Sequence, residues 1–227
     1  MGNSLLPLRE SSLFSGVAED DLQKLSECLL AREKAFRRDE FVFHEGAEVR
    51  DVYFILSGKL HIINEDFWGN RSIIETMSKD TLFGEAYVFS GRKNHLVSVV
   101  AAQDSIVLEI EPKSLFECCP RQCECHTRLT RNALYIVSEK IVRLTEKTGH
   151  IMQRTTREKL LSYLSKRTQT DKSSSFEIPY SRQQLADYLC VDRSALSHEL
   201  SKLQKSGMIK YHKNHFELMK PEECGAL

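Results

Sequence analysis

The chain has 227 residues, and its 32 Lys and Arg balance its 32 Asp and Glu. This length is too great for one small core and suits two domains. The sequence has no run of about eighteen apolar residues, and its first residues do not combine a charged region with a long apolar stretch, so it supports neither a membrane span nor a signal peptide. We therefore expect a cytoplasmic protein whose seven cysteines are free thiols, ligands or redox switches rather than a disulfide framework.

The charges are unevenly distributed along the chain. Residues 153–220 hold thirteen Lys and Arg against seven Asp and Glu, whereas residues 1–152 hold nineteen against twenty-three. A basic C-terminal part behind an acidic N-terminal part indicates a nucleic-acid partner for the basic part.

The N-terminal half reads as one helix followed by many strands. A helix is predicted at Glu19–Ala31, with Leu22, Leu25 and Leu29 on one face. From Phe36 to Ile110, short apolar runs alternate with Gly-rich turns, which is typical of a jelly roll or small barrel.

Two turns are predicted within this strand region. VYFILSGKLHII, which starts at Val52, alternates in hydropathy on both sides of Ser57-Gly58 and predicts a hairpin. A second turn is predicted at Trp68-Gly69-Asn70. LVSVVAAQDSIVLEI, which starts at Leu96, supplies two further β-branched strands.

After Pro120 the pattern becomes a long helix without glycine until Gly149. From about Gln122 to Gln153 it would extend roughly 50 Å. We expect a homodimer through this helix, and the alternative is one amphipathic helix packed on its own barrel. Apolar residues recur at the three- and four-residue steps of a heptad seam, namely at Leu134, Val137, Ile141, Leu144 and Ile151.

A second domain is predicted to begin at residues 152–155, where Thr155 and Glu158 fit a capping box for a new helix. Residues 182–200 then read as helix, tight turn, helix. The first of these helices buries Leu185, Ala186 and Leu189.

The second helix of the pair is predicted to start at Arg193, with Asp192 accepting hydrogen bonds from its first N–H groups, and to end at Gly207. MIKYHKNHFEL then predicts two strands around Lys213-Asn214, a β wing. The helix buries Leu196, Leu200 and Leu203 and displays Arg193, Ser194, Ser197, His198, Ser201 and Lys202.

This order of segments resembles the Crp/Fnr family of bacterial transcription regulators. The resemblance is carried by VYFILSGKLHI, by FGEAYVFSG at 83–91, by the dimer-type helix and by SRQQLADYLCVDRSALSHELSKLQKSGMI at 181–209. It implies an α+β fold with three parts: an effector-sensing, cyclic-nucleotide-binding-like double-stranded β-helix or jelly roll at 1–118, a dimerisation helix at 119–153, and a winged helix-turn-helix at 154–220.

The resemblance also implies an effector pocket. In relatives that bind cyclic AMP, an Arg followed by Ser or Thr holds the cyclic phosphate, and a Thr-Ser pair of the dimer helix meets the adenine. The matching positions here are His95-Leu96, which cannot replace a bidentate anion clamp, and Leu144-Thr145, which departs from the adenine-contacting pair. We therefore expect an effector other than cyclic AMP. Gly84-Glu85 belongs to the same pocket in relatives, but it also has a structural interpretation in which Gly adopts a strained dihedral and Glu bonds the backbone.

A cysteine cluster lies at the junction of the barrel and the long helix, at Cys118, Cys119, Cys123, Cys125 and His126. The cluster fits reduced thiols at a helix start, a redox switch, or a metal or iron-sulfur site. The metal alternative rests on Cys119 and Cys123, which are four residues apart and would lie on one face of a helix.

The resemblance raises two cofactors of relatives, an iron-sulfur cluster and haem. Iron-sulfur members of the family carry their cysteines mainly before the barrel, where this sequence has only Cys28, so it does not reproduce their oxygen-sensing cluster. Haem is a further alternative, with an axial ligand from His44, His61, His95 or His126.

By resemblance, DNA is read by the second helix of the pair, and duplex DNA with an inverted repeat and RNA polymerase are the expected partners. The residues expected to reach base edges or phosphates are Ser181, Arg182, Gln183, Arg193, Ser194, Ser197, His198 and Lys202. The alternative is a ligand-binding module whose winged domain binds protein. The sequence has no hydrolase triad, HExxH or phosphate-binding Gly loop, so we do not expect an enzyme.

Overall fold

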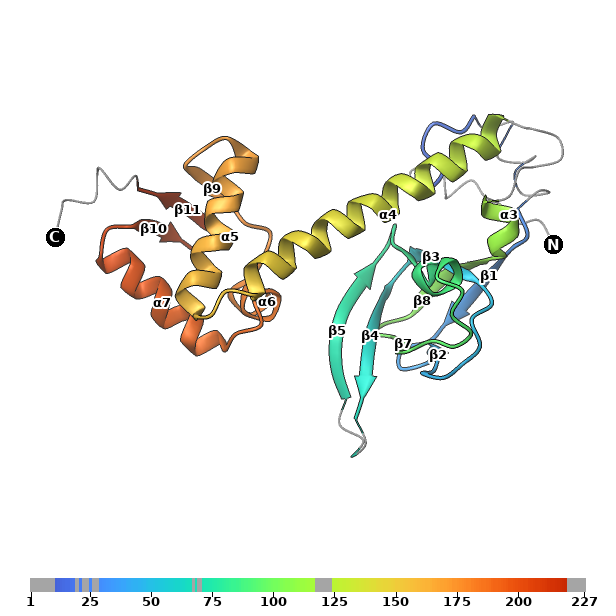
Figure 1. Ribbon diagram of the computed structural model, residues 1–227, viewed down its shortest axis with the longest axis horizontal. Coiled ribbons are helices and arrows are strands. Elements are labelled where there is room, and N and C mark those ends of the chain that lie inside the picture. The colour runs from blue at the N-terminus through green and yellow to red at the C-terminus, as the bar shows by residue number, and fades with distance from the viewer. Residues whose placement is uncertain are drawn as a thin grey trace. The chain divides into compact units, whose positions relative to one another are not determined.

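The computed structural model describes residues 11–18, 21, 25, 29–66, 68, 71–116 and 124–219. The chain divides into two compact units, 1–139 and 140–227, and the boundary lies inside helix α4 (Glu124–Ile151). Figure 1 labels the helices and strands of both units. Each unit has hydrophobic core residues of its own. The described residues include no helix that is both long and apolar enough to cross a membrane.

The described part of the first unit contains two four-stranded antiparallel sheets. This double-sheet roll confirms the predicted jelly-roll class. In spatial order, the first sheet consists of β1 (Ala31–Phe36), β8 (Ser105–Ile110), β3 (Val52–Ser57) and β6 (Leu82–Phe83), and the second of β2 (Phe41–Phe43), β7 (Ser98–Ala101), β4 (Lys59–Glu65) and β5 (Arg71–Ser78).

The hairpin predicted around Ser57-Gly58 is wrong, because β3 and β4 belong to different sheets. β3 pairs with β8 and β6, whereas β4 pairs with β7 and β5. Gly58 has φ 94°, and a Cβ there would overlap the Ser105 side chain. The chain therefore changes sheets at Gly58, where only glycine fits the close approach.

The predicted turn at Trp68-Gly69-Asn70 and the helix predicted at Glu19–Ala31 both lie partly outside the described residues. β4 and β5 form a hairpin that closes at Glu65 and Arg71, although residues 67, 69 and 70 of its turn lie outside the described residues. Most of the helix predicted at 19–31 also lies outside them. Ala31 opens β1 and pairs with Ile110, so the predicted helix does not reach it.

Two apolar layers stabilise the first unit. One lies between the two sheets and includes Phe36, Phe43 and Leu60. The other covers the outer face of the β3 sheet with α3 (Pro112–Phe116) and the start of α4, and Leu129 is fully buried there. Burying a Leu or Phe side chain contributes about 1.5–3 kcal/mol, so the start of α4 is held firmly to its own sheet.

The second unit is a winged helix-turn-helix, as predicted. Its sheet has the order β10-β11-β9 in the described residues. The segment TQTDKSSS at 168–175 reads from sequence as a polar loop, but α5 continues through Asp171 and β9 begins at Ser175, so that prediction is wrong at both ends. Leucines of three helices pack with Phe176 and Phe216. The elements are α5 (Thr156–Asp171), β9 (Ser175–Glu177), α6 (Arg182–Tyr188), α7 (Arg193–Lys205), β10 (Ile209–His212) and β11 (His215–Leu218).

The helix ends follow local sequence signals, with one exception. Thr155 and Glu158 form the predicted capping box, and Ser181 and Gln184 form a second one. Asp192 stands at the N-cap of α7 as predicted, but within the described structure its side chain makes no capping hydrogen bond, so that expectation is wrong. Gly207 has φ 72° and ends the helix.

Candidate DNA-binding surface and effector pocket

Helix α7 buries one face and displays the other. Leu196, Leu200 and Leu203 are fully buried in the core of the second unit. The side chains on the opposite face are exposed, as the sequence predicted, and they are those of Arg193, Ser194, Ser197, His198, Ser201 and Lys202. This face offers hydrogen-bond donors and acceptors on a rigid helix.

Some of these polar groups already have partners within α7. The Ser197 hydroxyl donates to the Arg193 carbonyl at 2.9 Å, and the Ser201 hydroxyl donates to the Ser197 carbonyl at 3.0 Å. The Lys202 ammonium lies 3.0 Å from a Glu199 carboxylate oxygen. The serines keep acceptor capacity, and the exposed Lys202 keeps its charge beside Glu199, because an ion pair at the surface is weak.

The three residues expected to hold phosphates at the start of α6 are also engaged. Ser181 accepts a hydrogen bond from the Gln184 amide, and the Gln183 side chain donates to Asp187 at 2.8 Å. Arg182 is half-buried and donates to the Lys213 carbonyl of the wing at 3.1 Å. Burial lowers the pKa of the Arg182 guanidinium from its ordinary value, although the group stays charged.

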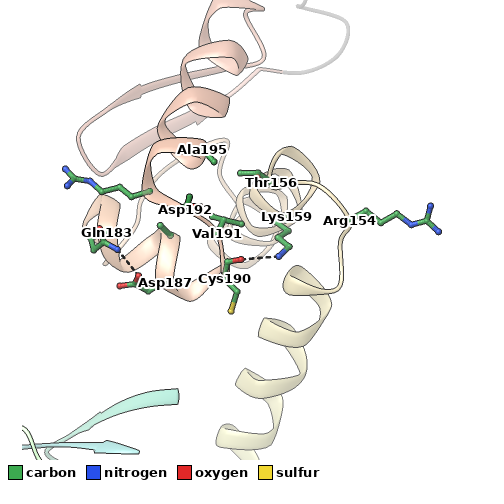
Figure 2. A pocket seen from close by; sticks show the side chains of 11 residues that line it. Arg154, Thr156, Lys159, Gln183, Asp187, Cys190, Val191, Asp192 and Ala195 are labelled. Carbon is green, nitrogen blue, oxygen red and sulfur yellow. Dashed lines mark hydrogen bonds between the residues drawn. The ribbon is translucent and has the colours of Figure 1, made fainter. Parts of the chain in front are cut away.

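A pocket of about 780 Å³ opens beside the start of α7, as Figure 2 shows. Arg154, Lys159 and Arg193 contribute positive charge to its lining, and Asp187 and Asp192 contribute negative charge. In Figure 2 the Arg154 side chain extends away from the other labelled residues. Sequence reasoning missed Arg154 and Lys159, because they precede the helix pair by more than twenty residues.

The Lys159 ammonium fixes the turn between the two helices. It lies 3.3 Å from the Leu189 carbonyl oxygen and 3.4 Å from that of Cys190, at the end of α6. Cys190 is exposed and has φ 52°, a left-handed conformation that is unusual for a residue with a Cβ. Lys159 thus offsets the negative end of α6 where the chain turns toward α7.

In the first unit, Gly84 and Glu85 open the short helix α2 (Glu85–Phe89). Gly84 has φ 83°, and a Cβ there would lie 2.9 Å from the Tyr53 ring. The structural interpretation of this glycine therefore holds: the backbone approaches an aromatic ring in a left-handed conformation. Glu85 is buried.

His95 lies deep in the roll, with 1% of its surface exposed. Its ring stacks on Phe43 at 3.7 Å and meets the edge of Tyr87 at 5.0 Å, which brings it beside α2. Neither ring nitrogen has a hydrogen-bond partner among the described residues. Burial lowers the pKa of His95, so its ring is neutral at neutral pH.

The other expected pocket residues are exposed. Leu96 follows His95 and points to solvent, and Leu144 and Thr145 lie on α4 in the second unit. The Thr145 hydroxyl donates to the Ile141 carbonyl of its own helix at 2.9 Å.

The cysteine cluster is described only in part, because Cys118, Cys119 and Cys123 lie outside the described residues. Cys125 is buried in the first core. His126 is 5% exposed, and its ring nitrogens have no hydrogen-bond partner in the part of the chain that the structure describes. That part contains no group of three or more His, Cys, Asp or Glu placed to hold a metal ion.

The remaining histidines suggested for haem are near the surface of the roll. His44 is exposed and stacks on Phe41 at 4.0 Å. The His61 Nδ1 atom lies 2.9 Å from the Thr76 hydroxyl.

Helix α4 carries an exposed apolar face. Of the predicted seam, Leu134 is 64% exposed, Ile141 59% and Leu144 48%. Val137 instead packs against the first core, and Ile151 is half-buried. The sequence prediction also missed two exposed apolar residues seven apart, Tyr135 and Val142.

The chain combines a double-sheet roll, a long helix and a winged helix-turn-helix whose second helix has a polar exposed face. This combination is typical of DNA-binding regulators that carry a ligand-sensing domain. Two family models match the chain: the cyclic nucleotide-binding domain over residues 33–122 and the Crp-like helix-turn-helix domain over residues 158–223. The chain belongs to the Crp/Fnr family and is a DNA-binding transcription regulator of that type. Members of this family are generally not enzymes.

Solved structures with a similar fold come from several bacteria. The c-di-GMP responsive global regulator CLP of Xanthomonas campestris is 18% identical over 87% of this chain and 96% of its own, with a TM-score of 0.53. DNR from Pseudomonas aeruginosa is 18% identical over 99% and 98%, with a TM-score of 0.47. The catabolite activator protein of Thermus thermophilus is 16% identical over 94% and 96%, with a TM-score of 0.46. Among curated proteins, none matches this chain.

Proposed function

We propose that this regulator acts as a cytoplasmic homodimer that binds an inverted repeat in duplex DNA and responds to a signal other than cyclic AMP. The observation that carries the DNA-binding mode is the face of α7, where exposed polar side chains lie opposite three buried leucines. In this proposal the chain consists of a sensing roll at 1–118, a dimerisation helix at 119–153 and a DNA-binding domain at 154–220. RNA polymerase is a further proposed partner.

In this proposal α7 enters the major groove. Arg193 recognises guanine, because a guanidinium can donate two hydrogen bonds to the O6 and N7 atoms of that base. Ser194, Ser197 and His198 reach neighbouring base edges from the same face. Dimer symmetry places the two half-sites about 10 to 11 base pairs apart, one turn of the double helix.

The exposed apolar face of α4 supports a dimer. Leu134, Ile141 and Leu144 leave a row of apolar surface in the single chain, and a second copy of the helix would cover it. Replacing Ile141 and Leu144 with Lys should therefore give monomers by light scattering at micromolar concentration. The control is Glu139→Lys, which changes an exposed residue two positions before Ile141 that is not part of the apolar row, and this variant should remain dimeric.

The environment of His95 supports a signal other than cyclic AMP. A neutral ring packed between Phe43 and Tyr87 cannot replace an arginine that clamps a phosphate. The effector pocket in this proposal comprises Gly84-Glu85, His95-Leu96 and Leu144-Thr145, and the cysteine cluster is the alternative sensor. Calorimetry with cyclic AMP should show no specific binding, and micromolar affinity would contradict the proposal.

Selection from random duplexes followed by affinity measurements tests the DNA-binding mode. Arg193→Ala should lose about 1–3 kcal/mol per half-site and relax the preference at one base pair. Lys205→Ala removes the same charge at the end of α7 and should keep the preference. A uniform loss for Arg193→Ala with an unchanged preferred sequence would mean that α7 does not read bases.

A further inference from the structure

The β wing is fastened to the first helix of the pair by one side chain. Arg182 is the first residue of α6, and its guanidinium donates to the Lys213 carbonyl at 3.1 Å. Lys213 and Asn214 form the turn between β10 and β11. This hydrogen bond joins residues 31 positions apart in the sequence.

The same guanidinium covers two aromatic rings. Its central carbon lies 5.1 Å from the centre of the Tyr211 ring and 5.6 Å from that of Phe216. These residues are directly opposite each other on β10 and β11, and their rings stack at 5.7 Å. Arg182 therefore lies over aromatic rings of both strands of the wing and donates one N–H to the turn that joins them.

The wing turn depends on contacts from outside itself. Lys213 has φ 53°, which is unfavourable for a residue with a side chain. The Asn214 carbonyl accepts a hydrogen bond from the Ile178 amide at 2.9 Å. The two turn carbonyls are thus held from two sides, by Arg182 and by Ile178, and the exposed Lys213 side chain projects from a fixed turn.

We propose that Arg182 is a positioning residue for DNA binding: it fixes the wing so that Lys213 meets the DNA backbone while α7 lies in the major groove. This role differs from the direct phosphate contact that the sequence predicted for Arg182. The inference rests on the proposed binding of duplex DNA by this domain.

The chemistry of the side chain separates the two roles. A direct phosphate contact needs a positive charge, which lysine also supplies. The contact with the wing needs a planar group that stacks on two rings while it donates to a carbonyl, and an ammonium cannot do both. Arg182→Lys should therefore bind DNA as poorly as Arg182→Ala.

Fluorescence anisotropy with one selected duplex measures this in the full-length protein. We expect a loss of affinity of about tenfold for Arg182→Lys and for Arg182→Ala, the size of effect of one lost hydrogen bond and its stacking contact. Lys213→Ala should lose a similar amount, and Arg182→Ala with Lys213→Ala should be no weaker than either single variant, because both changes remove the same DNA contact. Lys205→Ala is the control for loss of charge.

Amide hydrogen exchange in the free protein gives a second readout. The Ile178 amide should exchange faster in both Arg182 variants, because the turn that accepts its hydrogen bond loosens. The Leu200 amide in the middle of α7 should exchange as in the wild type, which shows that the domain still folds.

Three results would overturn the assignment. They are wild-type affinity in Arg182→Lys, fully additive losses in the double variant, or unchanged exchange at Ile178. If the wild-type protein bound no duplex, the proposed function would fail and with it the role of Arg182 in DNA binding. Faster exchange at Ile178 would then still show that Arg182 holds the wing.

Discussion

Both compact units bury histidine rings, and His95 of the roll and His150 of the DNA-binding unit differ in their partners. In the roll, His95 stacks on Phe43, and its nitrogens find no hydrogen-bond partner among the described residues. In the DNA-binding unit, His150 lies in the last turn of α4, and its Nδ1 atom lies 2.8 Å from the Ser162 hydroxyl of α5. Burial lowers the pKa of both rings.

The two rings therefore differ in whether a neighbouring side chain offers a hydrogen bond: Ser162 does so for His150, and no described residue does so for His95. The last turns of α4 are tied to the DNA-binding unit by His150, by a 3.2 Å ion pair between Glu146 and Lys166, and by Lys147 over the Tyr188 ring. A buried polar group without a partner costs stability. The first unit carries that cost at His95, whose ring lies beside α2, and at His126.

The largest expected effect tests whether the units are independent at all. Phe54→Ala in the roll and Phe216→Ala in the DNA-binding unit each remove a fully buried ring and should each cost about 3–5 kcal/mol. Calorimetry should show that each variant lowers one transition and leaves the other in place. A single transition that both variants lower equally would mean that the molecule unfolds as one unit.

The next effect compares the two histidines directly. His150→Phe should destabilise its unit by about 1–2 kcal/mol, because it removes the hydrogen bond to Ser162 and leaves that half-buried hydroxyl without its histidine partner. His95→Phe should be neutral or stabilising, because an apolar ring can keep the stack on Phe43. Urea unfolding measures both variants, and equal losses would show that His95 is satisfied after all.

Acid should act on both units through these rings. The folded-state pKa of each histidine is below its ordinary value of 6.5, so the unfolded chain binds more protons. The free energy of unfolding is then highest above pH 6.5 and falls as the pH drops through the folded-state pKa values. His95→Phe should flatten this pH dependence in the transition of the roll, and His150→Gln should flatten it in the other. A variant that keeps the full acid sensitivity would assign it to other groups.

The smallest effect concerns the ion pair near the end of α4. Glu146→Gln should cost about 0.5 kcal/mol or less, because both partners of the Glu146–Lys166 pair are partly exposed to water. The loss should be seen as a small decrease in the melting temperature at low salt. It should vanish at about 1 M salt, because dissolved ions then screen the attraction between the two charges. A loss that persists at high salt would mean that Glu146 contributes through packing.

The DNA-binding unit could be predicted closely because its signals are local. The capping box of Thr155 and Glu158, the leucine spacing of α7 and the stop at Gly207 all lie within a few residues of what they determine. The hairpin at Ser57-Gly58 failed because alternation identifies strands and turns but not the strand that becomes the partner. Pairing of β3 with β8 joins residues about fifty positions apart, and no local pattern specifies it.

The same distinction applies to the candidate site. The exposed face of α7 follows from helical periodicity alone. The tie from Arg182 to the wing and the placement of Lys159 against the Cys190 carbonyl depend on contacts across 31 residues, which only the folded backbone creates. The charge and helix-start position of Arg182 predict a phosphate contact, which stays a prediction, whereas its partners within the protein are visible only in the structure.

The continuous α4 helix restricts how this protein can be dissected. The boundary between the units falls between Glu139 and Lys140, within a helix of 28 residues. A cut there leaves roughly four carbonyl groups on one fragment and four N–H groups on the other without their helical partners. A DNA-binding fragment that keeps the whole helix avoids this but exposes Leu129 and Ala133, which the roll normally covers. Fragments of this regulator made for crystallography or binding assays must therefore accept either a frayed helix or a bare apolar stripe.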